Sequence, residues 1–139
     1  MSRNSKRHNL PRRRRSRRGT ATVEFAVCLP VILTLVLGAI ECCSMIFVQQ
    51  SLEIIAYEGA SVVIRPDGTS ADAQARCDQI IAERDLNDVT VAFNPGNVEA
   101  VSRRTPITVT VSAPTDANSV MKLKFFSGDL QSQTVMIKE

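Results

Sequence analysis

A long uncharged apolar stretch limits this chain more than any other feature. Sixteen uncharged residues, 25–40, separate Glu24 from Glu41. A helix over residues 20–40 would be about 31 Å long, close to the thickness of a bilayer's hydrocarbon core. A buried helix of a soluble domain is seldom apolar on every face. The stretch therefore predicts a transmembrane helix over residues 20–41, with Glu41 as a solvated carboxylate at its outer end.

The residues before this helix are strongly basic. Residues 1–18 hold nine of the 17 Lys/Arg and no carboxylate, which leaves eight Lys/Arg against fourteen Asp/Glu in the remainder. Basic residues beside a span stay on the cytoplasmic side. The arm lacks the aromatics that stack on bases, so nucleic acid is not an expected partner. The predicted topology signal consists of Arg12, Arg13, Arg14, Arg15, Arg17 and Arg18.

Three targeting signals compete with a membrane anchor. A secretory signal peptide has a basic start, an apolar region of about 7–15 residues and small residues at the cut. The apolar stretch here is longer, and Leu37-Gly38-Ala39 is a weak cleavage site. The chain lacks the small residue that a lipoprotein signal requires before Cys28. It also lacks the apolar pair that follows the arginines of a twin-arginine signal. None of the three explains Glu24.

The helical pattern continues beyond the predicted span, over residues 42–65. An apolar or small residue recurs there every three or four positions, at Met45, Val48, Leu52, Ile55 and Gly59. This stripe packs either on the chain's own domain or on sister subunits. Arg65-Pro66-Asp67-Gly68 has the composition of a turn that ends the helix.

Residues 66–139 predict a small α+β domain. Thr69 and Asp72 have the spacing of a helix cap, which predicts a second helix to about Leu86 that buries Ala73, Cys77, Ile80 and Ile81. Beyond it the apolar period changes to two, as in strands. The expected strands contain Val89, Val91 and Phe93; Ile107, Val109 and Val111; Met121, Leu123 and Phe125; and Val135 and Ile137, with a loop over residues 114–119.

The sequence offers little for catalysis or metal binding. The sole histidine, His8, lies in the basic arm, and no phosphate-binding loop is visible. The four cysteines lack metal-ligand spacing. Cys77 could pair with Cys42 or Cys43 in an oxidising compartment, although buried free thiols are the favoured state. We therefore expect no enzyme activity, cofactor or metal.

The N-terminal block resembles a prepilin processing site. A basic leader precedes Gly19, then four residues, the pair Glu24-Phe25 and the apolar helix. The Glu-Phe pair, followed by Leu29-Pro30, is similar to the TadE-like pseudopilins of tight-adherence (Tad/Flp) systems. Weaker similarity lies in residues 55–60, in the strand over residues 107–111 and in the C-terminal residues 136–139.

The resemblance implies a processed minor pseudopilin of a Tad/Flp-type pilus or secretion assembly, active in adhesion and surface colonisation. A prepilin peptidase would cut between Gly19 and Thr20 and recognise Glu24 and Phe25. The other implied partners are pilin and pseudopilin subunits, the Tad membrane platform and membrane lipid. Residues 1–19 would be the leader, and the C-terminal domain would lie outside the bacterial inner membrane. The alternative is an unrelated single-span protein that exposes a small α+β binding module.

A carboxylate in the first turns of a membrane helix is costly. Its insertion costs about 2.5–3.5 kcal/mol on translocon scales. Gly19 has no side chain to clash with a peptidase that binds extended backbone. Cleavage would create an amine at Thr20, about 6 Å along the helix axis from Glu24. Glu24 would then pair with that amine or with a neighbouring subunit's, unless it only snorkels to the cytoplasmic edge.

Overall fold

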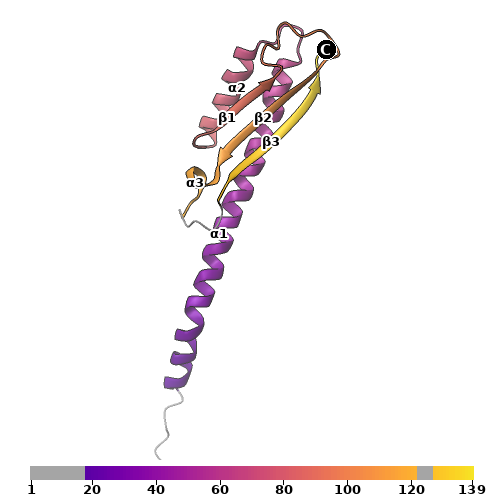
Figure 1. Ribbon diagram of the computed structural model, residues 1–139. Helices are drawn as coiled ribbons and strands as arrows, with labels where there is room; N and C mark the ends of the chain where they lie inside the picture. The colour runs from indigo at the N-terminus through magenta and orange to yellow at the C-terminus, as the bar shows by residue number, and fades with distance from the viewer. Residues whose placement is uncertain (1–17, 122–126) are drawn as a thin grey trace, which may run out of the picture. The chain divides into compact units, whose positions relative to one another are not determined.

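The computed structural model describes residues 18–121 and 127–139 and is an α+β structure. Its elements are α1 (Arg18–Val63), α2 (Ser70–Glu83), β1 (Thr90–Asn94), β2 (Pro106–Pro114), α3 (Thr115–Asn118) and β3 (Asp129–Ile137). The chain separates into two compact units, residues 1–36 and 37–139. The predicted fold class, a long apolar helix followed by a second helix and an antiparallel sheet, is confirmed (Figure 1).

The uncharged apolar stretch of α1, residues 25–40, begins in the first unit and ends in the second. One 18-residue window of this helix has a mean hydropathy of 2.4, and no residue in it is buried by the rest of the protein. α1 is long and apolar enough to cross a membrane. Pro30 lies inside the helix and has no N–H for the carbonyl of Ala26. The Thr34 hydroxyl donates to the Pro30 carbonyl at 2.8 Å one turn later.

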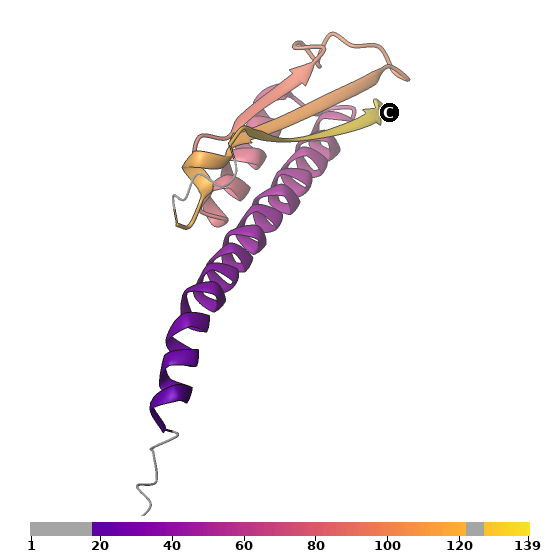
Figure 2. The ribbon, with the colours of Figure 1, turned by 60° about the horizontal axis from the view of Figure 1, so that its bottom comes forward.

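In the second unit, α1 and α2 pack on one face of a three-stranded antiparallel sheet of order β1-β2-β3 (Figures 1 and 2). The central strand β2 places Ile107, Val109 and Val111 in the core, each completely buried. The helices contribute a stripe from α1 and one face of α2. The α1 stripe, which is Met45, Val48, Leu52, Ile55 and Gly59, is buried against the chain's own domain.

The second helix begins with the predicted cap. The Asp72 N–H donates to the Thr69 hydroxyl at 3.0 Å, and that hydroxyl donates to the Asp72 carboxylate at 2.8 Å. α2 ends at Glu83, three residues before the predicted end at Leu86. Asp85 follows with a φ of 53°, a left-handed conformation that cannot continue the helix.

The strand predictions are confirmed with three corrections. β3 forms, but the apolar residues that indicated it, Val135 and Ile137, are 58% and 61% exposed, whereas Leu130 and Met136 pack on the core. The predicted loop over residues 114–119 is the last residue of β2, the short helix α3 and its C-cap. The strand expected from Met121 to Phe125 lies, apart from Met121, outside the described residues, and Met121 is not in a strand.

Candidate functional site

The proposed cleavage site lies in the first turn of α1. The helix begins at Arg18, so the bond between Gly19 and Thr20 is helical in this structure. Among the described residues, and apart from the two chain neighbours and the helix backbone, no atom lies within 4 Å of a Cβ built on Gly19; Thr20 is exposed. A peptidase that binds extended backbone must unwind this turn. A glycine lowers that cost, because it is about 1 kcal/mol less favourable in a helix than alanine.

Glu24 and Phe25 are both exposed on the same helix. Residues four apart share a face of an α-helix, so Glu24 lies one turn above Thr20 on one side of α1. Phe25 is 60% exposed and points away from that side by about 100°. Among residues 18–121 and 127–139, no hydrogen bond or ion pair reaches the Glu24 carboxylate. An exposed acid on an uncovered apolar helix is available to a group outside this chain.

Glu41 is the main correction to the sequence interpretation. We predicted a solvated carboxylate, but Glu41 is only 1% exposed. One of its oxygens accepts a hydrogen bond from the Ser119 hydroxyl, and the other accepts from the Met121 N–H at 3.3 Å. About one helical turn after Glu41, the Ser44 hydroxyl donates to the Asn118 carbonyl at 3.5 Å. These contacts fix the chain after α3 to the start of the buried part of α1.

A signal for this contact exists in the sequence. Glu41 lies four residues before Met45, on the same face of the helix as the buried stripe. Extending the stripe by one turn would have placed Glu41 against the domain. We instead predicted that Glu41 is exposed to solvent, because its side chain is acidic and lies at the end of the apolar stretch. Its partners, Ser119 and Met121, lie nearly 80 residues away.

The cysteines do not form the disulfide that the sequence left open. Cys77 is buried, and its thiol lies 3.7 Å from the Ile55 carbonyl. Cys42 and Cys43 are about 18 Å or more below Ile55 along α1, too far for a bond to Cys77. Cys42, Cys43 and Cys77 are free, as predicted. Their predicted burial is correct for Cys77 and wrong for Cys42 and Cys43, which are exposed in the described chain.

Burial changes the acidity of Cys77. The thiol packs beside Gly59, and loss of solvation raises its pKa to about 11, with smaller contributions from the nearby Asp78 and Glu58 carboxylates. The Arg76 guanidinium acts in the opposite direction. A thiol of this kind stays protonated at physiological pH and is a poor nucleophile.

The remaining predicted residues are only partly described. Arg12, Arg13, Arg14, Arg15 and Arg17 lie outside the described residues, and Arg18 is the first residue of α1. Within residues 18–121 and 127–139, no group of three His, Cys, Asp or Glu side chains is arranged to hold a metal ion.

Comparison with known proteins gives one match. Residues 19–61 match the sequence model of the TadE-like protein family. The match begins at Gly19, includes Thr20, Glu24 and Phe25, and ends two residues before α1 does. The predicted resemblance is thereby confirmed over this segment. No curated protein and no solved structure matches the chain.

Proposed function

From the TadE-like signature in residues 19–61, which implies a part in Tad pilus assembly, we propose that this protein is a minor pseudopilin. A prepilin peptidase removes residues 1–19, and the product joins or primes a Tad/Flp-type assembly that serves adhesion or secretion. The chain is a peptidase substrate and has no catalytic role of its own. The observation that carries the proposal is an uncovered apolar helix with an exposed Glu24 five residues after Gly19.

The topology follows from charge and hydropathy. α1 fits a single-pass membrane protein. We propose that the basic residues 1–18 hold the N-terminus in the cytoplasm and that the sheet domain lies outside the bacterial inner membrane. The net excess of acidic residues after position 18 agrees with this orientation. The cytoplasmic start of α1 is then within reach of a membrane peptidase.

Glu24 supplies the proposed assembly contact. Cleavage creates a positively charged amine at Thr20, and an unpaired carboxylate in the hydrocarbon region is unfavourable by about 2.5–3.5 kcal/mol. Pairing Glu24 with the amine of a neighbouring pilin-type subunit removes that penalty and sets the axial position of the two helices. Other subunits and the membrane platform of the Tad system are the proposed partners.

The Glu24 contact is testable separately from processing. The Glu24→Gln variant keeps the size of the side chain and removes its charge. We expect normal cleavage, with incorporation into isolated filaments or platform complexes reduced at least about tenfold, the effect of 1.4 kcal/mol. The matched control is Glu99→Gln, an exposed carboxylate outside the apolar stretch and outside α1. Normal incorporation of the processed Glu24→Gln chain would show that charge pairing does not drive assembly.

The second candidate is a single-span protein unrelated to pili. It would use α1 only as an anchor and expose the sheet domain as a binding module. The groove between α1 and β3, lined by Glu53, Ile54, Tyr57, Glu58 and residues 132–134, is the observation that favours it. Such a protein would keep residues 1–19 in cells with an active prepilin peptidase.

A further inference from the structure

The face of α1 that points away from the domain core carries large apolar side chains. Ile46 and Tyr57 are each 57% exposed, Phe47 is 48% exposed and Ile54 is 40% exposed. Tyr57 is the sole tyrosine of the chain. This face lies on the side of α1 opposite the buried stripe, and the Arg84 guanidinium covers part of it, over the Phe47 ring. Contiguous apolar surface on a domain of this size indicates an interaction site.

The spacing on this face is that of a two-helix seam. We define the outer stripe as the five residues Cys43, Phe47, Gln50, Ile54 and Tyr57, all exposed and separated by alternating steps of four and three. Alternating steps of three and four define the contact positions of a coiled coil. A straight, narrow stripe of this kind matches another helix better than a sheet or an extended peptide.

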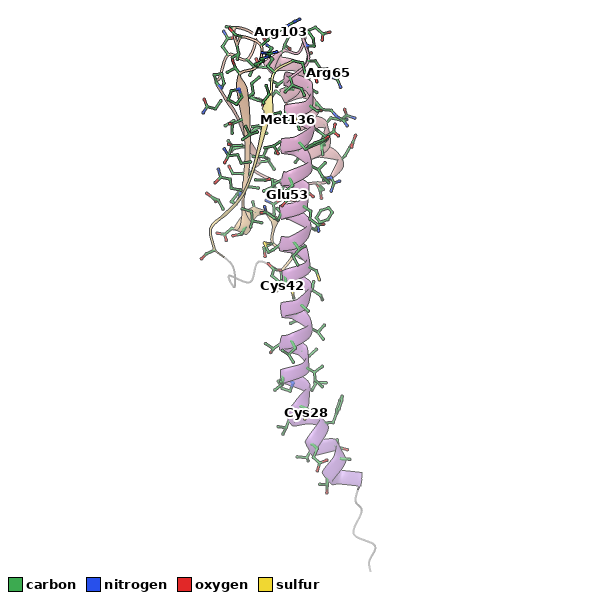
Figure 3. The ribbon with its side chains drawn as sticks, turned by 90° about the vertical axis from the view of Figure 1, so that its right-hand side faces the viewer. Cys28, Cys42, Glu53, Arg65, Arg103 and Met136 are labelled. Atoms are coloured by element: carbon green, nitrogen blue, oxygen red, sulfur yellow. The ribbon has the colours of Figure 1, made fainter. Side chains whose placement is uncertain are left out.

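The two flanks of the outer stripe carry different charged side chains. One flank has Glu53 of α1 (Figure 3), which has no ion-pair partner among the described residues. The other flank has Glu58 together with two arginines. Arg76 binds the Glu58 carboxylate at 3.2 Å. Arg84 lies over the Phe47 ring at 5.9 Å and donates to the Ser51 hydroxyl at 3.1 Å. Among the described residues, one flank therefore has an unpaired carboxylate, Glu53, and the other has a guanidinium, Arg84, that forms no ion pair.

We propose that the outer stripe is the seam of a parallel dimer between two copies of this chain. Membrane anchoring in one orientation makes the two α1 helices parallel. Two-fold symmetry then places the flank of each copy that carries Glu53 against the flank of the other that carries Arg84. Along the axis of α1, Arg84 lies near the level of Phe47, and Arg76 lies near the level of Glu58. Glu53 lies between these two levels. Both arginines of the second copy are thus within reach of Glu53.

The structure has room for that contact. A groove of about 550 Å³ lies beside Glu53, between α1 and Ser132, Gln133 and Thr134 of β3. An arginine side chain from the second copy can enter it and meet the Glu53 carboxylate. In the seam, the Gln50 amides of the two copies face each other, and a paired polar residue at such a position fixes the register of the helices. Cys43 lies at the membrane-proximal end of the seam.

Two native cysteines make the dimer testable in the full-length chain. Cys42 and Cys43 are both exposed, but they point about 100° apart around α1, and only Cys43 is in the seam. Mild oxidation of native membranes with oxygen and a copper catalyst joins two thiols into one disulfide and passes their electrons to oxygen. We expect a covalent dimer that Cys42→Ser retains and Cys43→Ser loses. Equal loss in the two variants, or no dimer in the unchanged chain, would overturn the proposal.

A second comparison separates the outer stripe from contacts between the membrane spans. Ile54→Glu and Tyr57→Glu place a charge in the seam of the extramembrane part and should slow Cys43 cross-linking at least about tenfold. Val135→Glu, at a 58% exposed position on the opposite face of the sheet, is the control and should cross-link normally. If both seam variants cross-link like the control, the spans alone hold the copies together and the proposed seam is wrong. Cross-linking should persist in cells without prepilin peptidase, because the dimer does not require cleavage.

Discussion

The carboxylate of Glu41 accepts a hydrogen bond from the N–H of Met121 across 3.3 Å, although 80 residues separate the two in sequence. A second bond from Ser119 completes the site, and Glu41 is almost fully buried. The contact ties the connection that follows α3 to α1 at the end of its apolar stretch. It therefore couples the fold of the sheet domain to the helix that anchors it.

Glu41→Ala should destabilise the sheet domain. The change removes a charged acceptor and leaves the Met121 N–H without its partner, which costs about 2–3 kcal/mol. Thermal unfolding of the full chain in detergent measures the effect. Glu99→Ala, at an exposed position, is the control and should stay within about 0.5 kcal/mol of the unchanged protein. Equal stability of the two variants would show that Glu41 is not buried in the folded protein.

Gly59→Ala should disturb the contact between α1 and α2. A Cβ at this position would lie 2.7 Å from the Cys77 sulfur, so the helices must shift, at an expected cost of about 1–3 kcal/mol. Shortening the opposing side chain with Cys77→Ala should recover part of that loss in the double variant. Gly38→Ala is the control, because nothing lies within 4 Å of its Cβ. Additive effects of Gly59→Ala and Cys77→Ala would contradict the close contact.

Stability should fall at high pH because of Cys77. Its folded pKa is about 11 and the ordinary value is 9.0, so above pH 9 the unfolded chain releases the proton first. The stabilisation that the protonated Cys77 thiol gives the folded state is fully present below pH 9 and is lost as the pH rises through 11. By pH 11 the free energy of unfolding has fallen by about 2 kcal/mol. Because lysines and the tyrosine titrate in the same range, the measurement is the difference in unfolding free energy between the unchanged chain and Cys77→Ala. Parallel pH curves for the two proteins would contradict the buried thiol.

The cysteines also report the proposed orientation. Cys42 and Cys43 follow the apolar stretch, Cys28 lies inside it and Cys77 is buried in the sheet domain. A membrane-impermeant maleimide added to spheroplasts should label Cys42, which lies outside the proposed seam, but neither Cys28 nor Cys77. Single-cysteine variants identify each site by mass. Labelling of Cys42 only after the membrane is opened would reverse the proposed topology.

Local patterns in the sequence predicted most of this fold. The apolar stretch, the Thr69 cap and the alternation in β2 each depend on neighbouring residues, and all three are confirmed. What failed depends on contacts between distant parts of the chain. The burial of Glu41 requires Ser119 and Met121, and the inward face of β3 is set by its register with β2. The outer stripe was not predicted, because the buried stripe on the opposite face of α1 has the clearer apolar spacing.

The candidate site was accessible from sequence for a different reason. Gly19, Glu24 and Phe25 lie within seven residues, so their spacing can be read without a fold. The structure adds that the Gly19–Thr20 bond is helical and that Glu24 is exposed. A flexible residue at position 19 would ease the unwinding that the proposed cleavage requires.

The mass of the mature protein in cells with an active prepilin peptidase tests the central proposal most directly. Processing after Gly19 predicts a chain that begins at Thr20 and lacks residues 1–19. Gly19→Ala should abolish the cut, whereas Gly38→Ala, at another glycine of α1 with open space around it, should leave the cut unchanged. A mature chain that retains residues 1–19 in those cells would contradict the assignment as a processed pseudopilin.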